Sequence, residues 1–176
     1  MLKKEIKEKN MNFILIGMPG SGKSTVGVIL AKMLSFDFID SDLVIQKRAG
    51  MPLQQIINTK GNDYFSKLEN DVNASLDVEN TVIATGGSAI FCEGAMEHFR
   101  KIGKIIYIKI TCDEMQKRIT NPTSRGIVLK DGQTLADMYK QRTPYYEKYA
   151  DITFDWTRGT AGDAAEEIKK VIESYR

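Results

Sequence analysis

The chain has 176 residues, which suits one domain large enough to bury a real core. Its hydrophobic share of 42% and charged share of 27% are those of an ordinary soluble globular protein. The net charge of +2 excludes a general basic field for nucleic acid, and no apolar run approaches the ~18 residues that span a bilayer. We therefore expect a cytoplasmic, monomeric protein with a small-molecule substrate and no nucleic-acid or membrane partner.

Residues 1–10 are charged throughout and lack the apolar segment of a signal peptide, so we expect an N-terminal extension followed by a single domain over 11–176. In that domain short apolar strands alternate with longer helical stretches, the pattern of a parallel α/β sheet. The expected strands are Phe13–Gly17, Phe38–Asp40, Thr81–Thr85, Lys104–Ile110 and Ile152–Phe154. The expected helices are Lys23–Leu34, Leu43–Arg48, Leu53–Thr59, Tyr64–Leu76, Gly94–Lys101, Asp113–Ile119, Thr134–Tyr149 and Ala161–Tyr175.

Residues 17–24 read Gly-Met-Pro-Gly-Ser-Gly-Lys-Ser, a full match to the phosphate-binding P-loop pattern. The loop follows an expected strand and opens an expected helix, which is the context that the pattern requires. Its glycines let backbone N–H groups converge on phosphate oxygens, and the helix dipole adds positive charge. Lys23 would reach the β- and γ-phosphates, and the Ser24 hydroxyl would hold Mg²⁺. The sequence therefore predicts that the chain binds a nucleoside triphosphate.

Asp40 and Asp42 stand at the end of the second expected strand, where a parallel sheet faces its ligand crevice. Two acids one residue apart point to opposite sides of a strand, so we expect them to have different roles. One can serve the Mg²⁺ shell, and the other can face the acceptor hydroxyl. The alternative is that Asp42 only caps the helix Leu43–Arg48.

Thr85-Gly86-Gly87-Ser88 follows the third expected strand and so also lies at the crevice edge. Paired glycines there allow backbone N–H groups to approach a ligand closely. A plain turn between strand and helix would explain the same residues.

The stretch 120–133 has no clear periodicity and contains Pro122, Gly126 and Gly132, so we expect a mobile lid. Arg118 and Arg125 flank or lie within it, and Arg142 follows it. Arginine binds phosphate or carboxylate through a planar fork, and phosphoryl transfer needs positive charge and exclusion of water. Each arginine taken alone could be a solvated surface charge.

With these motifs together, the chain resembles the shikimate kinases, small P-loop kinases related to the nucleoside-monophosphate kinases. The resemblance covers Met11 to about Arg158. It is carried by Gly-Met-Pro-Gly-Ser-Gly-Lys-Ser-Thr (17–25), Phe-Ile-Asp-Ser-Asp (38–42), Ala-Thr-Gly-Gly-Ser (84–88) and Arg-Thr-Pro-Tyr-Tyr (142–146).

The resemblance implies a three-layer α/β fold, in which helices flank a five-stranded parallel sheet of order 2-3-1-4-5. It implies ATP-dependent phosphorylation of the shikimate 3-hydroxyl, in aromatic amino-acid biosynthesis, with Mg²⁺. Lys23, Asp42 and Arg125 would be catalytic, and Ser24 and Asp40 would hold the metal. Shikimate would contact Asp42, Lys67, Gly86, Gly87 and Arg142. The nucleotide would contact Gly20, Ser21, Gly22, Lys23, Ser24, Thr25, Arg118 and Arg158.

Three departures from the family pattern concern the acceptor side and the lid. Ser66 stands where the family carries a carboxylate-binding arginine, and Ser88 stands for the third glycine of a Gly-Gly-Gly run. The lid reads Arg125-Gly126-Ile127-Val128 in place of Arg-Pro-Leu-Leu. Lys67 could partly substitute for the arginine, although an ammonium lacks the bidentate fork.

These departures keep two alternatives open beside the kinase of shikimate. One is a P-loop kinase of another small hydroxylated acid or polyol. The other is a nucleotide-binding protein without turnover, which would have little need of Asp42 and Arg125.

Overall fold

The computed structural model describes residues 11–120, 127 and 129–174. Its strands are β1 (Asn12–Ile16), β2 (Asp37–Asp40), β3 (Thr81–Ala84), β4 (Gly103–Lys109) and β5 (Ile152–Asp155). They form one parallel sheet of order β2-β3-β1-β4-β5, which confirms the expected order. The predicted extension, residues 1–10, lies outside the described residues.

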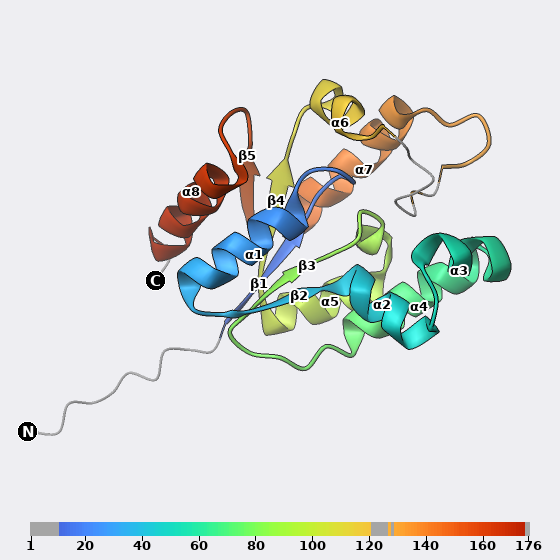
Figure 1. Ribbon diagram of the computed structural model, residues 1–176, viewed down its shortest axis with the longest axis horizontal. Helices are drawn as coiled ribbons and strands as arrows, with labels where there is room; N and C mark the ends of the chain where they lie inside the picture. The colour runs from blue at the N-terminus through green and yellow to red at the C-terminus, as the bar shows by residue number, and fades with distance from the viewer. Residues whose placement is uncertain (1–10, 121–126, 128, 175–176) are drawn as a thin grey trace, which may run out of the picture.

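Helices cover both faces of this sheet (Figure 1). They are α1 (Lys23–Leu34), α2 (Ser41–Ala49), α3 (Leu53–Lys60), α4 (Asn62–Ala74), α5 (Glu93–Ile102), α6 (Cys112–Arg118), α7 (Leu135–Tyr149) and α8 (Ala161–Ser174). A short 3-10 turn, η1 (Ala89–Phe91), was not expected from the sequence. No helix in the described ranges combines the length and apolar character needed to cross a bilayer.

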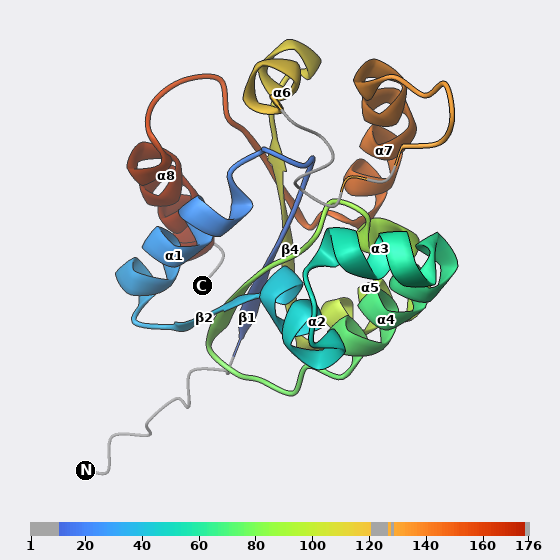
Figure 2. The same ribbon diagram turned by 45° about the vertical axis from the view of Figure 1, so that its right-hand side comes forward.

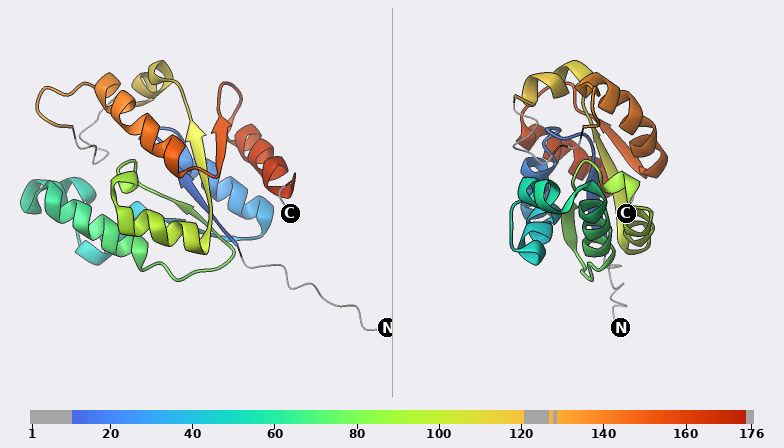
Figure 3. Two further views of the ribbon diagram at one scale, coloured as in Figure 1. Left: turned by 180° about the vertical axis from the view of Figure 1, so that it is seen from behind. Right: turned by 90° about the vertical axis from the view of Figure 1, so that its right-hand side faces the viewer.

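Alternation along β1 divides the core into two layers. Phe13 and Leu15 pack with α1 and α8, while Ile14 and Ile16 pack on the other face with α5 and α7. Figure 3, seen from behind, shows α5 and α7 lying over that second face. All five residues of β1 are buried, as expected of a central parallel strand.

Helices α2, α3 and α4 form a smaller packed unit beside the β2 edge (Figure 2). Its apolar centre consists of Ile45, Ile56, Phe65 and Val72. Residues of α2 and α4 line the same pocket as the P-loop, so these helices form one wall of the crevice.

The start of α2 corrects one sequence-based expectation. The helix begins at Ser41 rather than Leu43, because the Asp40 side chain accepts a hydrogen bond from the Asp42 N–H and caps it. The cap that the sequence allowed for Asp42 is therefore supplied by Asp40. Asp42 stands in the first helical turn, so the argument from strand alternation does not describe it.

Candidate active site

The P-loop turns tightly between β1 and α1. Gly20 and Gly22 have φ of 76° and 89°, in the left-handed region that favours glycine, and the Ser21 N–H donates to Met18 O at 3.1 Å. Gly22 forms the N-cap of α1 without a side-chain cap. The first turn of α1 lines the pocket, so the N-terminus of this helix faces the crevice, as an anion-binding loop requires.

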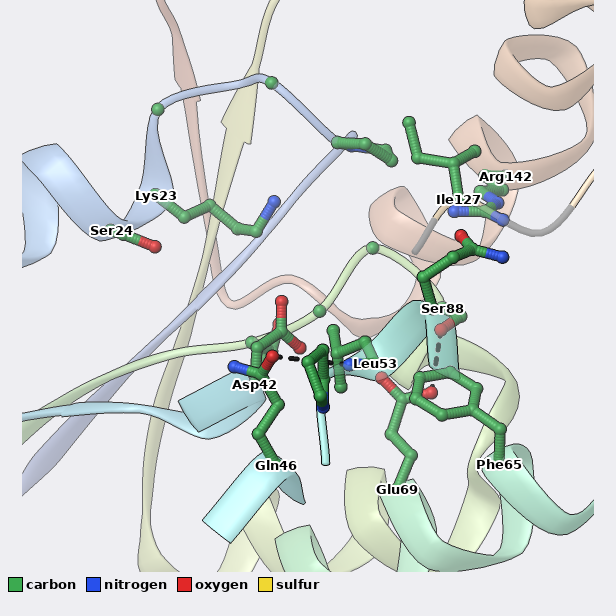
Figure 4. A pocket seen from close by; sticks show the side chains of 18 of the residues that line it. Lys23, Ser24, Asp42, Gln46, Leu53, Phe65, Glu69, Ser88, Ile127 and Arg142 are labelled. Atoms are coloured by element: carbon green, nitrogen blue, oxygen red, sulfur yellow. Dashed lines mark hydrogen bonds between the residues drawn. The ribbon is translucent and has the colours of Figure 1, made fainter. Parts of the chain in front are cut away.

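Lys23 is only 7% exposed. Its Nζ donates to Gly17 O and Met18 O, both at 2.8 Å, so the ammonium lies inside the curve of the loop. Figure 4 shows the side chain extending over the pocket from the start of α1. A cation so placed can be shared between the loop carbonyls and the phosphates of a bound nucleotide.

Ser24 and Asp40 come together from two elements. The Ser24 Oγ donates to Asp40 Oδ2 at 2.6 Å, although 16 residues separate them. Hard oxygen donors of this kind suit Mg²⁺, which commonly takes one or two protein ligands and completes its shell with water and phosphate oxygens. Within the described residues there is no cluster of three or more His, Cys, Asp or Glu, so a cage built only of such side chains is not available there.

A pocket of about 420 Å³ joins the P-loop to the α2–α4 wall. Its lining includes most of the predicted site residues and one residue of the predicted lid, Ile127. The lining residues used below are Gly22, Lys23, Ser24, Asp42, Glu69, Gly86, Gly87, Ser88 and Arg142.

Two acids in this pocket have raised pKa values. The pKa of Asp42 is raised to about 6, chiefly by removal from water and also by the negative charge of Asp40, while Lys23 opposes the shift. The pKa of Glu69 is raised to about 7, again chiefly by burial, with the Ser88 hydroxyl and Arg142 opposing the shift and Asp42 adding to it. Paired acids with raised pKa values in a crevice are typical of a functional site.

Arg142 is a buried cation that lines the same pocket as these acids. It lies in α7, is 5% exposed, and its guanidinium stands 5.7 Å from the centre of the Phe91 ring. Its Nε has no hydrogen-bond partner among the described residues. One turn later on α7, the Tyr146 hydroxyl donates to Gly87 O at 2.6 Å and fixes the Gly86-Gly87 backbone against the helix.

Arg118 lies on the far side of the P-loop. Its guanidinium carbon stands 4.6 Å from the centre of the Trp156 ring, and its Nη1 donates to Gly20 O at 3.5 Å. A Cβ built on Gly22 would meet the Trp156 ring at 2.7 Å, so the indole also packs on the loop. This pair offers a flat, polarizable wall beside the P-loop.

Some predicted site residues are not brought into the pocket. Lys67 is exposed and, with Ser66, Phe91 and Glu93, lines a separate, more open hollow rather than the pocket that Arg142 lines. Arg158 is exposed and also lies outside the pocket lining. Thr25 and Gly20 do line it. Arg125 lies outside the described residues, as does half of the predicted lid (residues 121–126 and 128).

Known proteins resemble this chain over nearly its whole length. The family model described as shikimate kinase matches residues 19–173. The chain belongs to the shikimate kinase family. A shikimate kinase of Pasteurella multocida is 35% identical over 93% of this chain and 95% of its own, and one of Moorella thermoacetica is 32% identical with the same coverage.

Solved structures of the family share the fold. A shikimate kinase from Acinetobacter baumannii in complex with shikimate has a TM-score of 0.87 and 30% identity, covering 96% of both chains. The enzyme from Aquifex aeolicus has a TM-score of 0.80 and 31% identity, covering 94% of this chain and 98% of its own. The predicted family and the sheet order are therefore confirmed.

Two residues of this shikimate kinase fold were not predicted as site residues. One is Glu69, which lies four residues after Phe65 and three before Val72 and so shares the buried face of α4. A lone acid on an apolar helical face was the signal that could have identified it. Trp156 follows an edge strand, and no sequence pattern placed it against Gly22.

Gly86 can be tested as the floor of the acceptor side of the pocket. A Cβ at this position would stand 2.7 Å from Glu69 Oε1 and 2.9 Å from Asp42 Oδ1, so Gly86→Ala must push both carboxyls aside. We expect the KM for the acceptor to rise ~10-fold or more, the loss of one or two polar contacts, while the Kd for ADP changes little. Steady-state kinetics give the KM for the acceptor, and calorimetry gives the Kd for ADP. Equal weakening of acceptor and ADP binding would contradict this placement.

Proposed function

We propose that the protein transfers the γ-phosphoryl group of ATP to the 3-hydroxyl of shikimate, giving shikimate 3-phosphate and ADP. The observation that carries the proposal is one pocket that holds the P-loop lysine at one end and Asp42 with the buried Arg142 at the other. Membership of the shikimate kinase family supports the choice of acceptor.

The P-loop end would bind ATP. The loop amides and Lys23 would hold the phosphates and stabilise negative charge on the transferring group, because phosphoryl transfer depends mainly on positioning and electrostatics. Arg118 would pack against the base together with Trp156. Ser24 and Asp40 would hold Mg²⁺, which when bound neutralises phosphate charge.

The other end would bind shikimate. Arg142 is a buried cation suited to the acceptor carboxylate, since a guanidinium binds carboxylate through two parallel hydrogen bonds. Asp42, facing Lys23 across the pocket in Figure 4, would orient the attacking hydroxyl and accept its proton. Arg125, which the sequence places in the lid, would bind the phosphates after the lid closes.

The single tryptophan gives a direct test of nucleotide binding. Because Trp156 contacts both Gly22 and Arg118, we expect ADP or ATP to change its fluorescence in a saturable way, and shikimate alone to leave it nearly unchanged. Trp156→Phe, which keeps a flat ring, should lose the signal and keep ADP binding by calorimetry. ADP binding without any change in Trp156 emission would place the nucleotide elsewhere.

A panel assay tests the acceptor. Purified protein with ATP and Mg²⁺ is offered shikimate, quinate, gluconate or a nucleoside monophosphate, and ADP release is coupled to NADH oxidation. We expect the kcat/KM for shikimate to exceed the others by at least ~10², the scale of discrimination that a site built to pair polar groups achieves. A higher kcat/KM for another acceptor would replace shikimate in the proposal.

A further inference from the structure

Glu69 and Ser88 form a hydrogen-bonded pair at the acceptor end of the pocket. Glu69 comes from α4 and is 1% exposed, and Ser88 comes from the loop between β3 and η1. The Ser88 Oγ donates to Glu69 Oε2 at 2.7 Å, drawn as a dashed line in Figure 4. Ser88 precedes η1 but its side chain makes no capping bond to that turn. The Ser88 hydroxyl therefore bonds to Glu69 and not to the backbone of that turn.

The second carboxyl oxygen of Glu69 has a different environment. Oε1 is buried and has no hydrogen-bond partner among the residues that the structure describes. Oε1 and Asp42 Oδ1 both lie against Gly86, because a Cβ built there would stand 2.7 Å and 2.9 Å from the two oxygens. A buried oxygen without a partner is costly, and a hydroxyl of a molecule bound in the pocket that Glu69 and Asp42 both line would supply one.

The titratable groups that face Glu69 come from three sides. Asp42 faces it from α2, Arg142 and Tyr146 from α7, and Cys92 from the end of η1. No salt bridge to Glu69 is formed within the described part of the chain. When Glu69 ionises, the described residues at the acceptor end therefore include two carboxylates, Asp42 and Glu69, beside the buried guanidinium of Arg142.

We propose that Ser88 is a positioning residue for the acceptor: its hydroxyl holds one oxygen of Glu69 and so directs the other, beside Asp42, to a hydroxyl of the bound substrate. The inference rests on the proposed function and deepens it. It makes the Glu69–Ser88 pair a determinant of acceptor affinity, and it leaves nucleotide binding at the P-loop end unaffected.

The pair also makes acceptor binding depend on pH. Loss of the Glu69 proton adds negative charge beside an acceptor that is itself an anion, so the KM for shikimate should rise as pH increases through about 7, where Glu69 titrates. The Ser88 hydroxyl donates to the charged form and lowers the pKa of Glu69. Removing it should therefore move this rise to higher pH.

The experiment compares wild type, Ser88→Ala and Glu69→Gln. We expect Ser88→Ala to raise the KM for shikimate ~10-fold at neutral pH, the loss of one positioned hydrogen bond, while kcat and the KM for ATP change less than about twofold. Between about pH 6 and 9 the KM rise should lie at higher pH in Ser88→Ala than in wild type, and it should be absent in Glu69→Gln, whose side chain does not ionise.

The matched control is Ser75→Ala, which removes a hydroxyl that donates to Val72 O at the end of the same helix α4, outside the pocket. It should leave all constants unchanged. Thermal unfolding verifies that each variant is folded. An unchanged shikimate KM in folded Ser88→Ala, or a pH rise that stays at the wild-type position, would overturn the inference. A wild-type protein that does not phosphorylate shikimate would instead overturn the proposed function.

Discussion

Lys23→Met is expected to lower kcat for phosphoryl transfer by ~10²–10³, the loss that follows removal of one preorganised charge from a developing transition state. Methionine keeps the length and most of the apolar stem of this buried side chain but has no charge. Methionine also cannot donate to Gly17 O and Met18 O, so we expect a modest fall in the melting temperature as well. Turnover is measured by the coupled assay at saturating ATP and shikimate.

Lys32→Met is the matched control, because Lys32 lies on the same helix α1 but is exposed near its C-terminus. It should retain wild-type kcat. A folded Lys23→Met variant with near-normal turnover would show that the P-loop lysine does not act on the transferring group.

Asp42→Asn is expected to lower kcat by ~10² or more, the usual contribution of a positioned group that accepts a proton in the transition state. Asparagine has nearly the same size and shape as aspartate, but its amide does not accept a proton from a hydroxyl at neutral pH. Since Asp42 stands across the pocket from the P-loop, the Kd for ADP should change by less than about threefold, within the effect of one weak charge interaction.

Asp37→Asn, at the exposed start of β2, is the control and should leave kcat unchanged. ADP binding by calorimetry is measured on the same samples. If Asp42→Asn weakened ADP binding as strongly as it slowed turnover, Asp42 would belong with Ser24 and Asp40 on the metal side, and the division between the two aspartates would be wrong.

Motifs and periodicity predicted the sheet, the helices and the position of the crevice, because each depends on local sequence. The P-loop pattern between an apolar strand and a helix is one example, and the buried run of β1 is another. Parallel strands place their carboxyl ends at one edge, so Asp40, Asp42 and Gly86 could be expected near the P-loop before any coordinates.

The parts that sequence could not predict depend on contacts between distant elements. The start of α2 was set by whether Asp40 or Asp42 capped the helix, and composition does not decide between the two. The Ser88–Glu69 bond joins residues 19 apart, and the packing of Trp156 on Gly22 joins β5 to the P-loop. The same limit explains Lys67, which is exposed because the buried side of α4 carries Phe65, Glu69 and Val72 instead.

The most direct test of the account is product identification. Purified protein is incubated with ATP, Mg²⁺ and shikimate, and the product is characterised by ³¹P and ¹H NMR, with Lys23→Met as the inactive control. The account predicts stoichiometric ADP and a single monophosphate ester on the 3-hydroxyl. ADP release without a phosphorylated shikimate, or phosphate on a different hydroxyl, would contradict it.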